Sequence, residues 1–325
     1  MIFYLLAIVL GFALLVWSAD RFVDGAASTA KHLGMPSLLI GILIVGFGTS
    51  APEMVVSAIA AYEGNPALAL GNAIGSNIVN IALILGVTAI VSPIMVNSKI
   101  VKKEIPLLLL IVLLTGYLLL DNSLTLFEGV ILLAAFFALI LWSVYTALKS
   151  RGDSLESEMD IELKEHSMSL KLGVIWLIFG LILLIVSSRI LVWGAVGVAV
   201  EFGVSDLIIG LTIVALGTSL PELAASVIAA RKGEHDIAIG NVVGSNMFNL
   251  LAVIGIAVVI APMNNIPLEV LQRDWIIMLL LTVALFVMAY GFKGRDGRIN
   301  KVEGTILILC YIAYNTYLGM SLVNS

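Results

Sequence analysis

The chain has 325 residues, of which 61% are hydrophobic and only 12% are charged, and its mean hydropathy is +1.12. A soluble globular protein carries roughly 25% charged residues, so this composition excludes an ordinary soluble domain and indicates a chain embedded in a bilayer. The formal net charge is −5, with no basic patch for nucleic acid, and the single cysteine, Cys310, cannot form a disulfide within the chain.

Apolar runs of about 20 residues recur along the chain and predict membrane-spanning helices. The first run begins without a basic segment, so we interpret it as a membrane helix and not as a cleaved signal. Ten spans are predicted, at residues 2–18, 36–60, 66–91, 105–120, 125–148, 172–192, 206–230, 236–261, 274–291 and 302–322. The most polar segment, residues 149–171, predicts a linker between a first five-helix repeat (1–148) and a second (172–325).

Lysine and arginine residues fall almost entirely in alternate loops. Fifteen of the 17 lie in the linker or in the loops between spans 1 and 2, 3 and 4, 7 and 8, and 9 and 10; only Arg189 and Arg273 lie elsewhere. The positive-inside rule makes these loops cytoplasmic and places both termini outside. The two repeats therefore cross the membrane in opposite directions. Inverted repeats are typical of secondary transporters, whose substrate site lies near the midplane.

One polar pattern occurs twice in otherwise apolar sequence. Residues 48–80 contain GTSAPE and then GNAIGSNIVN, and residues 217–249 contain GTSLPE and then GNVVGSNMFN. A constant offset of 169 residues relates Glu53 to Glu222 and Asn80 to Asn249. We expect the two copies to face each other around metal ions.

A proline precedes the glutamate in each copy. Pro52 cannot donate to the carbonyl of Gly48, so the helix is predicted to break or kink and to free carbonyl oxygens; Pro221 does the same to Gly217. Free carbonyls at membrane depth must be buried in protein or line a wet cavity. Small residues four apart also recur in both copies, and these allow close helix packing: Gly71, Gly75, Gly240 and Gly244.

The two copies together supply two carboxylates, freed carbonyls, four hydroxyls near the carboxylates and two amides, with no His or Cys. These hard oxygen donors suit Ca²⁺ and Na⁺. Zn²⁺ and copper favour imidazole or thiolate, and Mg²⁺ gives up its waters reluctantly. The charge of two glutamates balances one Ca²⁺ or two Na⁺. A glutamate at the bilayer centre is costly unless paired, so two at matched positions call for a cation or a proton.

Alternative interpretations exist for individual residues. The glutamates and amides could form a structural polar network, which the duplication disfavours, and the serines could bond the preceding helical turn. Four asparagines suit hydrogen bonds between helices better than metal ligation: Asn72, Asn77, Asn241 and Asn246. Asp20 and Arg189 occupy equivalent positions, and snorkelling to the interface explains them. The acidic run at residues 156–165 is more typical of a solvated loop than of a regulatory cation site.

The doubled GTSxPE and GNxxGSNxxN pattern in inverted halves resembles the α-repeats of the cation/calcium antiporter superfamily, and is most similar to prokaryotic sodium/calcium exchangers. The resemblance implies ten helices, with spans 2, 3, 7 and 8 forming a core and the long, tilted spans 1 and 6 sliding against it. It implies side-chain ligands at Glu53, Glu222, Thr49, Ser50, Thr218, Ser219, Ser76, Ser245, Asn80 and Asn249. Backbone oxygens near Gly46 and Ala215 would complete outer sodium sites.

The implied activity is entry of Na⁺ coupled to extrusion of Ca²⁺ across the cell membrane by alternating access. We expect a multi-pass transporter that works as a monomer, is not an enzyme and needs no cofactor, with Na⁺, Ca²⁺ and the lipid bilayer as its partners. Some exchangers of this family carry Asp at the position of Asn249, so two amides here put sodium stoichiometry and proton coupling in question. The alternatives are a proton-coupled antiporter for Ca²⁺ or another divalent cation, a passive cation channel, and a non-transporting sensor or scaffold.

Overall fold

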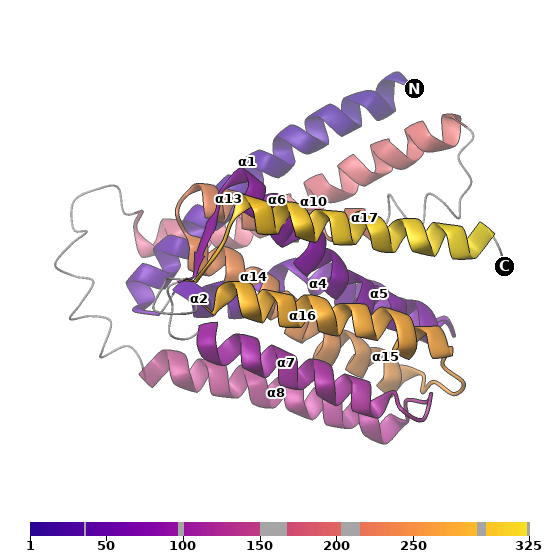
Figure 1. Ribbon diagram of the computed structural model, residues 1–325. Helices are drawn as coiled ribbons and strands as arrows, with labels where there is room; N and C mark the ends of the chain where they lie inside the picture. Colours follow the sequence, from indigo (N-terminus) through magenta and orange to yellow (C-terminus); the bar gives the residue numbers. More distant parts are fainter. Residues whose placement is uncertain (36, 97–100, 150–167, 203–214, 291–296, 324–325) are drawn as a thin grey trace.

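The computed structural model describes residues 1–35, 37–96, 101–149, 168–202, 215–290 and 297–323, and every structural statement below concerns these residues. The described chain is almost entirely helical (Figure 1). The first half contains α1 (Ile2–Leu33), α2 (Ser37–Ile40), η1 (Gly41–Gly46), α3 (Phe47–Thr49), α4 (Ala51–Tyr62), α5 (Pro66–Ile78), η2 (Val79–Leu85), α6 (Gly86–Val91), β1 (Ile94–Val96), α7 (Val101–Leu118) and α8 (Leu126–Lys149). Most of the predicted linker lies outside the described residues.

The second half has a similar order of helices, but its strand lies between the last two helices and not before them. It contains α10 (Leu170–Glu201), α12 (Ala215–Thr218), α13 (Leu220–Arg231), α14 (His235–Phe248), η4 (Asn249–Val253), α15 (Ile254–Ile260), η5 (Val270–Trp275), α16 (Ile276–Ala289), β2 (Gly297–Ile299) and α17 (Lys301–Val323). The η segments are π-helical turns, which are frequent at functional sites. Strands β1 and β2 pair antiparallel, with Ile94 opposite Ile299, and join the two halves.

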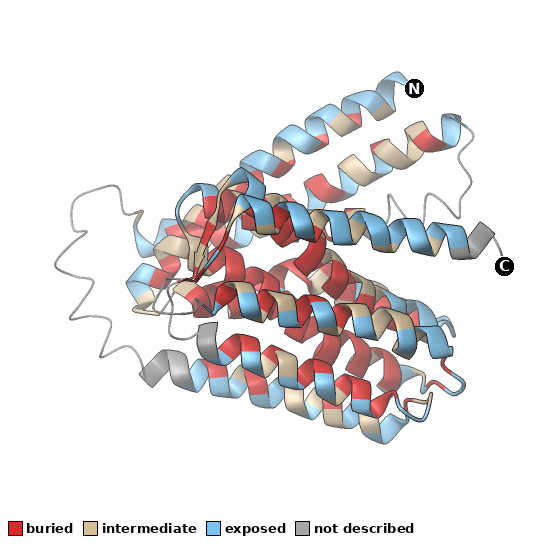
Figure 2. Cartoon of the chain, in the orientation of Figure 1, coloured by how far each residue is buried: buried red, intermediate tan, exposed pale blue. Residues whose placement is uncertain are grey.

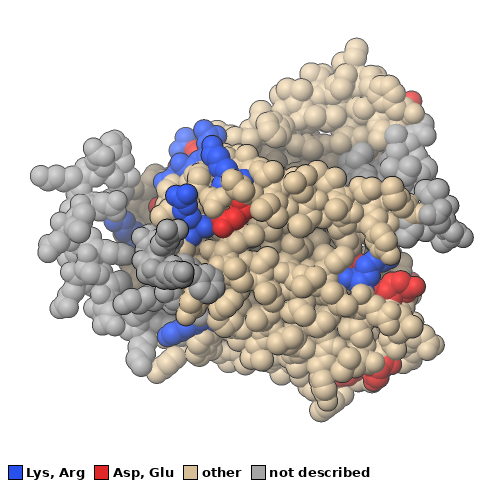
Figure 3. All heavy atoms as spheres, viewed as in Figure 1, with Lys and Arg blue, Asp and Glu red and all other residues tan. Residues whose placement is uncertain are grey.

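Several helices are long and apolar enough to cross a membrane. In the described part of the chain six meet this condition, and the bent pair Ser37–Thr49 and Ala51–Tyr62 would be a seventh. Large apolar side chains on the outer helices are exposed, among them Phe3, Phe127 and Leu141. A broad uncharged band also separates the charged residues near the two ends of the visible surface (Figure 3). The chain is therefore a membrane protein whose outer face contacts lipid.

The two faces of the molecule can be named by what they carry. Met1 and Val323 lie near one face, the terminal face, and Lys149 and Leu170, which flank the linker, lie near the opposite face, the linker face (Figure 1). Helix α1 runs from the terminal face to the linker face, whereas its counterpart α10 runs the other way. The elements with matching sequences therefore run in opposite directions.

The polar segments lie at the centre of the molecule. In the span made by α14, η4 and α15, 83% of the most apolar window is buried, against 28% for α1 and α10. Figure 2 shows the same contrast between a buried interior and exposed outer helices. The polar residues of the repeats are therefore held by the most constrained helices.

Helices α1 and α10 cross each other symmetrically. Gly11 packs on Leu191, and its equivalent Gly180 packs on Phe22; Ser18 and Ser187 meet at 3.5 Å between their Oγ atoms. Each helix has 32 residues and is about 48 Å long, well beyond the roughly 30 Å of bilayer hydrocarbon.

The predicted first and sixth spans, residues 2–18 and 172–192, are therefore too short. The first predicted span ended before Asp20, but helix α1 continues through Asp20, Arg21 and Asp24 to Leu33, and α10 continues beyond residue 192 to Glu201. Two of these side chains form an ion pair within the helix, at 3.9 Å between Arg21 and Asp24. A charged side chain that forms an ion pair can therefore lie inside a helix without ending it.

Glycines let α14 approach α2 and η1 backbone to backbone, as the small-residue spacing predicted for Gly240 and Gly244; the same prediction is wrong for Gly71 and Gly75, where an added Cβ would meet nothing described within 4 Å. A Cβ at Gly240 would lie 2.7 Å from the carbonyl oxygen of Leu38, and one at Gly244 would lie 2.8 Å from the Cα of Ile42. Both neighbouring atoms belong to the backbone, which cannot move aside as the end of a flexible side chain can. This contact joins the centre of one repeat to the centre of the other.

We expect Gly240→Ala to destabilise the protein by about 1–3 kcal/mol, because the added methyl group overpacks a backbone contact. Gly319→Ala on α17 is the matched control, since nothing described lies within 4 Å of its Cβ position. Thermal unfolding in detergent measures both variants. An unfolding temperature for Gly240→Ala equal to that of Gly319→Ala would contradict the packing seen here.

Candidate cation site at the repeat interface

The chain bends at the first polar motif, as its proline predicts. The segments Ser37–Thr49 and Ala51–Tyr62 meet at an angle of 42°, and Ser50 lies between them with φ −83° and ψ −1°. Ser219 occupies the same place in the second copy, with φ −91° and ψ 6°. In each copy a proline starts the next helix, so the break follows from its missing amide hydrogen.

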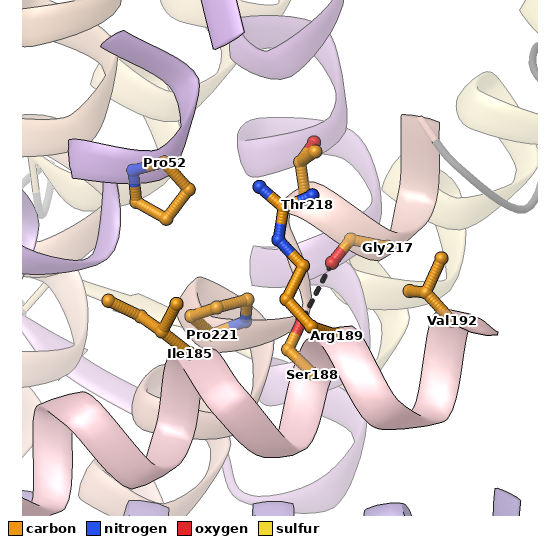
Figure 4. A pocket seen from close by; sticks show the side chains of 8 residues that line it. All are labelled: Pro52, Ile185, Ser188, Arg189, Val192, Gly217, Thr218 and Pro221. Carbon is orange, nitrogen blue, oxygen red and sulfur yellow. Dashed lines mark hydrogen bonds between the residues drawn. The ribbon is translucent and has the colours of Figure 1, made fainter. Parts of the chain in front are cut away.

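The carbonyl of Gly217, predicted to be free, accepts a hydrogen bond from Ser188 Oγ at 2.9 Å (Figure 4). Ser188 lies on α10 and is buried. The equivalent residue in the first repeat is Ala19, which has no hydroxyl to donate to Gly48. The two breaks are therefore equivalent in backbone but differ in the partner that α10 or α1 can supply.

Asn80 and Asn249 each lie at a π-helical turn. Asn249 is the first residue of η4 and Asn80 the second residue of η2. Asn80 Nδ2 donates to Asn246 Oδ1 at 3.0 Å, and Asn249 Nδ2 donates to Asn77 Oδ1 at 3.2 Å. The two bonds are equivalent, because the offset of 169 residues relates Asn80 to Asn249 and Asn77 to Asn246. Both bonds connect the two repeats.

Two further asparagines anchor the bent helices. Asn72 donates to Ser57 Oγ at 3.1 Å, and Asn241 donates to Ser226 Oγ at 2.8 Å, again an equivalent pair. Asn241 Oδ1 also lies 3.1 Å from Thr49 Oγ1. The predicted role of these asparagines in bonding between helices is confirmed by their hydrogen bonds.

Glu53 and Glu222 are buried, with 1% and 2% of their surface exposed, and lie within electrostatic range of each other. Ser50 Oγ donates to Glu222 Oε1 at 3.3 Å across the repeat interface. The Thr218 hydroxyl lies close to the Glu53 carboxylate, but among the described residues both Glu53 carboxylate oxygens and Glu222 Oε2 have no well-formed hydrogen bond. Buried carboxylates without partners are costly, so this arrangement needs a cation or a proton.

The amide oxygens of Asn80 and Asn249 are also buried and without a partner in the described part of the chain. The Nδ2 groups of Asn80 and Asn249 donate to Asn246 and Asn77, so their own Oδ1 atoms take no part in these bonds. With the three carboxylate oxygens, five unpartnered oxygens lie on four residues that the repeat relates in pairs. Carboxylate and amide oxygens are the donors that Ca²⁺ accepts in proteins.

The hydroxyl groups predicted to bind cations differ in their partners. Thr49 Oγ1 donates to the carbonyl of Val45 at 3.0 Å, so this hydroxyl bonds the preceding turn and the Thr49 carbonyl is the better donor to a cation. Ser245 Oγ lies 3.4 Å from the carbonyl of Gly46, which places that carbonyl beside the second polar segment. Ser76 and Ser219 are buried.

Most of the predicted residues thus lie on the central helices at the repeat interface. Direct contacts connect Thr49, Ser50, Glu222, Ser245, Gly46, Asn80 and Asn249 to the opposite repeat. Ala215 begins α12, and its side-chain environment lies outside what the structure describes. Among the described residues, no three or more His, Cys, Asp and Glu side chains are placed so that together they could hold a metal ion.

A small pocket lies beside the two prolines. It has a volume of about 20 Å³, room for about one water molecule, and is lined by Pro52, Ile185, Ser188, Arg189, Val192, Gly217, Thr218 and Pro221. Figure 4 shows the Arg189 side chain extending from α10 toward Thr218. Arg189 lies within electrostatic range of Glu53.

Sequence reasoning missed Ser188 and the proximity of Arg189 to the glutamates. Neither has a counterpart of the same residue type in the first repeat, since Ala19 and Asp20 stand there. A search for duplicated residues cannot find positions where the repeats differ. Ser57 and Ser226 were also missed, although they are duplicated, because they lie past the glutamates on apolar helices.

The sequence profile of the family described as "Sodium/calcium exchanger protein" matches residues 3–145 and 172–320. A relative named putative antiporter CaxA, from Alkalimonas amylolytica, is 47% identical over 97% of this chain and 98% of its own. The sodium/calcium exchanger MaX1 of Methanosarcina acetivorans is 27% identical over 95% and 96%. A solved structure of the sodium-calcium exchanger NCX_Mj, soaked with Na⁺ and Sr²⁺, has a TM-score of 0.81 at 31% identity and covers 97% of this chain and 98% of its own.

Proposed function

Because this chain belongs to the sodium/calcium exchanger protein family, a family of membrane transporters, we propose that it is a secondary-active antiporter that exchanges Na⁺ for Ca²⁺. The observation that supports the proposal best is the set of five buried oxygens without partners on Glu53, Glu222, Asn80 and Asn249. Neutral protein groups cannot compensate two adjacent buried carboxylates. A bound Ca²⁺, or two Na⁺, would balance their charge.

Competition for shared oxygens gives the proposed mechanism. Ca²⁺ would bind both glutamates together with the carbonyls of Thr49 and Thr218. Several Na⁺ would divide the same oxygens, with Ser76, Ser245 and the carbonyls near Gly46 and Ala215 completing smaller shells. Either load leaves the site near neutral, so helices α1 and α10 can slide past it. An empty site would carry uncompensated charge, which opposes the change of state and favours exchange over leak.

The proposed topology is ten membrane helices in two inverted five-helix repeats, residues 1–148 and 172–325, joined by a linker at 149–171. The opposite directions of α1 and α10 support it (Figure 1). Described basic residues near the linker face include Arg21, Lys31, Arg231, Lys232 and Lys301. The positive-inside rule would make that face cytoplasmic and both termini extracytoplasmic. We propose that the protein resides in the cell membrane and acts as a monomer.

The decisive experiment follows Ca²⁺ uptake by reconstituted vesicles. Vesicles loaded with Na⁺ are diluted into Na⁺-free buffer that contains radioactive Ca²⁺. We expect uptake that requires internal Na⁺, because only an outward Na⁺ gradient supplies the driving force. Vesicles loaded with K⁺ and vesicles containing no protein are the controls.

A second candidate is a proton-coupled antiporter for Ca²⁺ or another divalent cation. The observation that favours it is the pair of amides at Asn80 and Asn249, where an aspartate would supply a further negative charge for Na⁺. Uptake that follows an imposed pH gradient and ignores Na⁺ would establish this alternative and reject sodium coupling. Currents that need no counter-ion would instead indicate a passive channel.

A further inference from the structure

The turns that follow α4 and α13 share one backbone geometry and occupy equivalent places in the two repeats. Gly64 has φ 83° and Gly233 has φ 81°, a left-handed conformation that favours glycine. The amide after each glycine bonds the carbonyl five residues earlier, at 2.8 Å in the first repeat and 2.9 Å in the second. The residue before each glycine is therefore held alike: Glu63 in one repeat and Lys232 in the other.

Lys232 fastens α13 to α1 at the linker face. Its Nζ lies 2.8 Å from a carboxylate oxygen of Asp20, 2.5 Å from one of Asp24 and 3.1 Å from the carbonyl of Asp20. Helix α1 packs along α13 beside these contacts. Asp20 therefore has an ion-pair partner, which replaces the earlier interpretation that it only snorkels.

The equivalent contact is not made at the terminal face. The repeat offset maps Asp20 to Arg189 and Lys232 to Glu63, so the two charges are exchanged between the helices. Both Arg189 and Glu63 are exposed, and among the described residues neither forms an ion pair. Helix α10 does not pack along α4 as α1 packs along α13. The pocket beside Pro52 lies where such packing would occur (Figure 4).

The crossing of α1 and α10 extends the equivalence to Arg189. The contacts of Gly11 with Leu191 and of Gly180 with Phe22 show that both helices cross at the same register. Arg189 therefore occupies on α10 the place that Asp20 occupies on α1, and its side chain extends toward Thr218 (Figure 4). If α10 moved against α4 as α1 now lies against α13, Arg189 would reach the turn that holds Glu63.

We propose that Arg189 and Glu63 form a second latch, which closes the terminal face when the Lys232 latch at the linker face opens. The inference rests on the proposed antiport, because alternating access requires two such states. The structure has the linker face latched and the terminal face unlatched. Each latch pairs a base with an acid, with the two charges exchanged between the helices.

The two latches differ in strength. Lys232 contacts two carboxylates, but the residue equivalent to Asp24 in the second repeat is Trp193. The terminal latch therefore has one acidic partner fewer. One exposed ion pair shifts an equilibrium by roughly two- to fivefold, so the resting protein is expected to favour the state with the linker face closed.

Cross-linking tests whether residues 63 and 189 meet. In a Cys310→Ser background, Glu63→Cys is combined with Arg189→Cys, and Asp20→Cys with Lys232→Cys provides the reference pair. A short bifunctional maleimide is used, because a direct disulfide requires Cα atoms within about 7 Å. We expect the 63–189 pair to cross-link at least fivefold faster than the matched pair Glu63→Cys with Ile190→Cys, whose second cysteine lies on the next residue of α10.

Purified protein in detergent, with Na⁺ or with Ca²⁺, suffices for this measurement, so it does not depend on transport. A rate for the 63–189 pair no higher than that of the 63–190 pair, while the reference pair cross-links, would overturn the latch. Failure of the vesicle experiment with the latch intact would reject sodium/calcium exchange but leave the two-state motion in place.

A charge exchange tests the ionic nature of the latch. Val192→Cys, in the lining of the pocket, reports opening of the terminal face by its rate of labelling with a maleimide. We expect Arg189→Glu to raise this rate by roughly two- to fivefold through loss of the ion pair, and the added Glu63→Arg to restore it. An unchanged rate in Arg189→Glu, or no restoration in the double variant, would overturn the ion pair.

Discussion

Replacing Glu53 or Glu222 with glutamine is expected to abolish Ca²⁺ transport, with at least a hundredfold loss of flux. Glutamine keeps the volume of the side chain but removes one of the two charges that balance Ca²⁺. A hundredfold loss corresponds to about 2.7 kcal/mol, which is modest for one missing charge in a buried divalent site. Uptake into Na⁺-loaded vesicles measures the loss.

The same variants distinguish a cation site from a structural network. No well-formed hydrogen bond holds the Glu53 carboxylate, although the Thr218 hydroxyl lies close to it, so Glu53→Gln should leave the unfolding temperature of the ion-free protein nearly unchanged or raise it by removing repulsion with Glu222. Ca²⁺ should stabilise the wild type, as any ligand of the native state does, but not the variant. A large drop in ion-free stability would indicate a structural role.

Glu104→Gln is the matched control, because Glu104 is also a buried carboxylate of an apolar helix, with 2% of its surface exposed. It lies on α7, outside the bent helices. We expect it to keep transport within about twofold of wild type, which is under 0.5 kcal/mol. Unchanged Ca²⁺ flux in both Glu53→Gln and Glu222→Gln would contradict the site assignment.

Asn249→Leu is expected to weaken Ca²⁺ binding and transport at least tenfold, about 1.4 kcal/mol. The substitution removes the unpartnered Oδ1 and leaves Asn77 Oδ1 without its donor. Asn80→Leu should have an effect of similar size, because its contacts are equivalent. Calorimetric Ca²⁺ binding and vesicle uptake measure both variants.

Asn249→Asp tests the charge at the same position. It keeps an oxygen ligand and adds a third negative charge, so one more Na⁺ is needed for neutrality and the dependence of transport on Na⁺ should become steeper. Asn315→Leu controls for loss of an amide, since Asn315 bonds only its own helix on α17. A Leu variant at position 249 with wild-type affinity would show that its amide is not a ligand.

The duplication made much of the site predictable. Glu53, Asn80 and their equivalents stood out because polar residues are expensive in apolar helices and these recur at a fixed offset. The bend at Ser50 followed from Pro52 alone, since a missing amide hydrogen acts locally. Hydrogen bonding between helices followed from amides in an apolar setting.

Other features depend on contacts that a single stretch of sequence does not contain. The full length of α1 was missed because hydropathy registers Asp20 as a break and cannot register Lys232 beside it. The π-helical turns at Asn80 and Asn249 carry no local signal, since tertiary packing selects them over an α-helix. Ser188 was invisible to a search for repeats because Ala19 stands at its equivalent.

The reciprocal amide bonds have a consequence for how such a chain can arise. Asn80 bonds Asn246 while Asn249 bonds Asn77, so residue i of one half contacts residue j of the other and j contacts i. This is the isologous pattern of a homodimer with a two-fold axis. A single half, inserted into the membrane in both orientations, would thus assemble the same ring of oxygens as an antiparallel dimer. Fusion of the halves then allows each copy to change alone, as Asp20 and Arg189 have done.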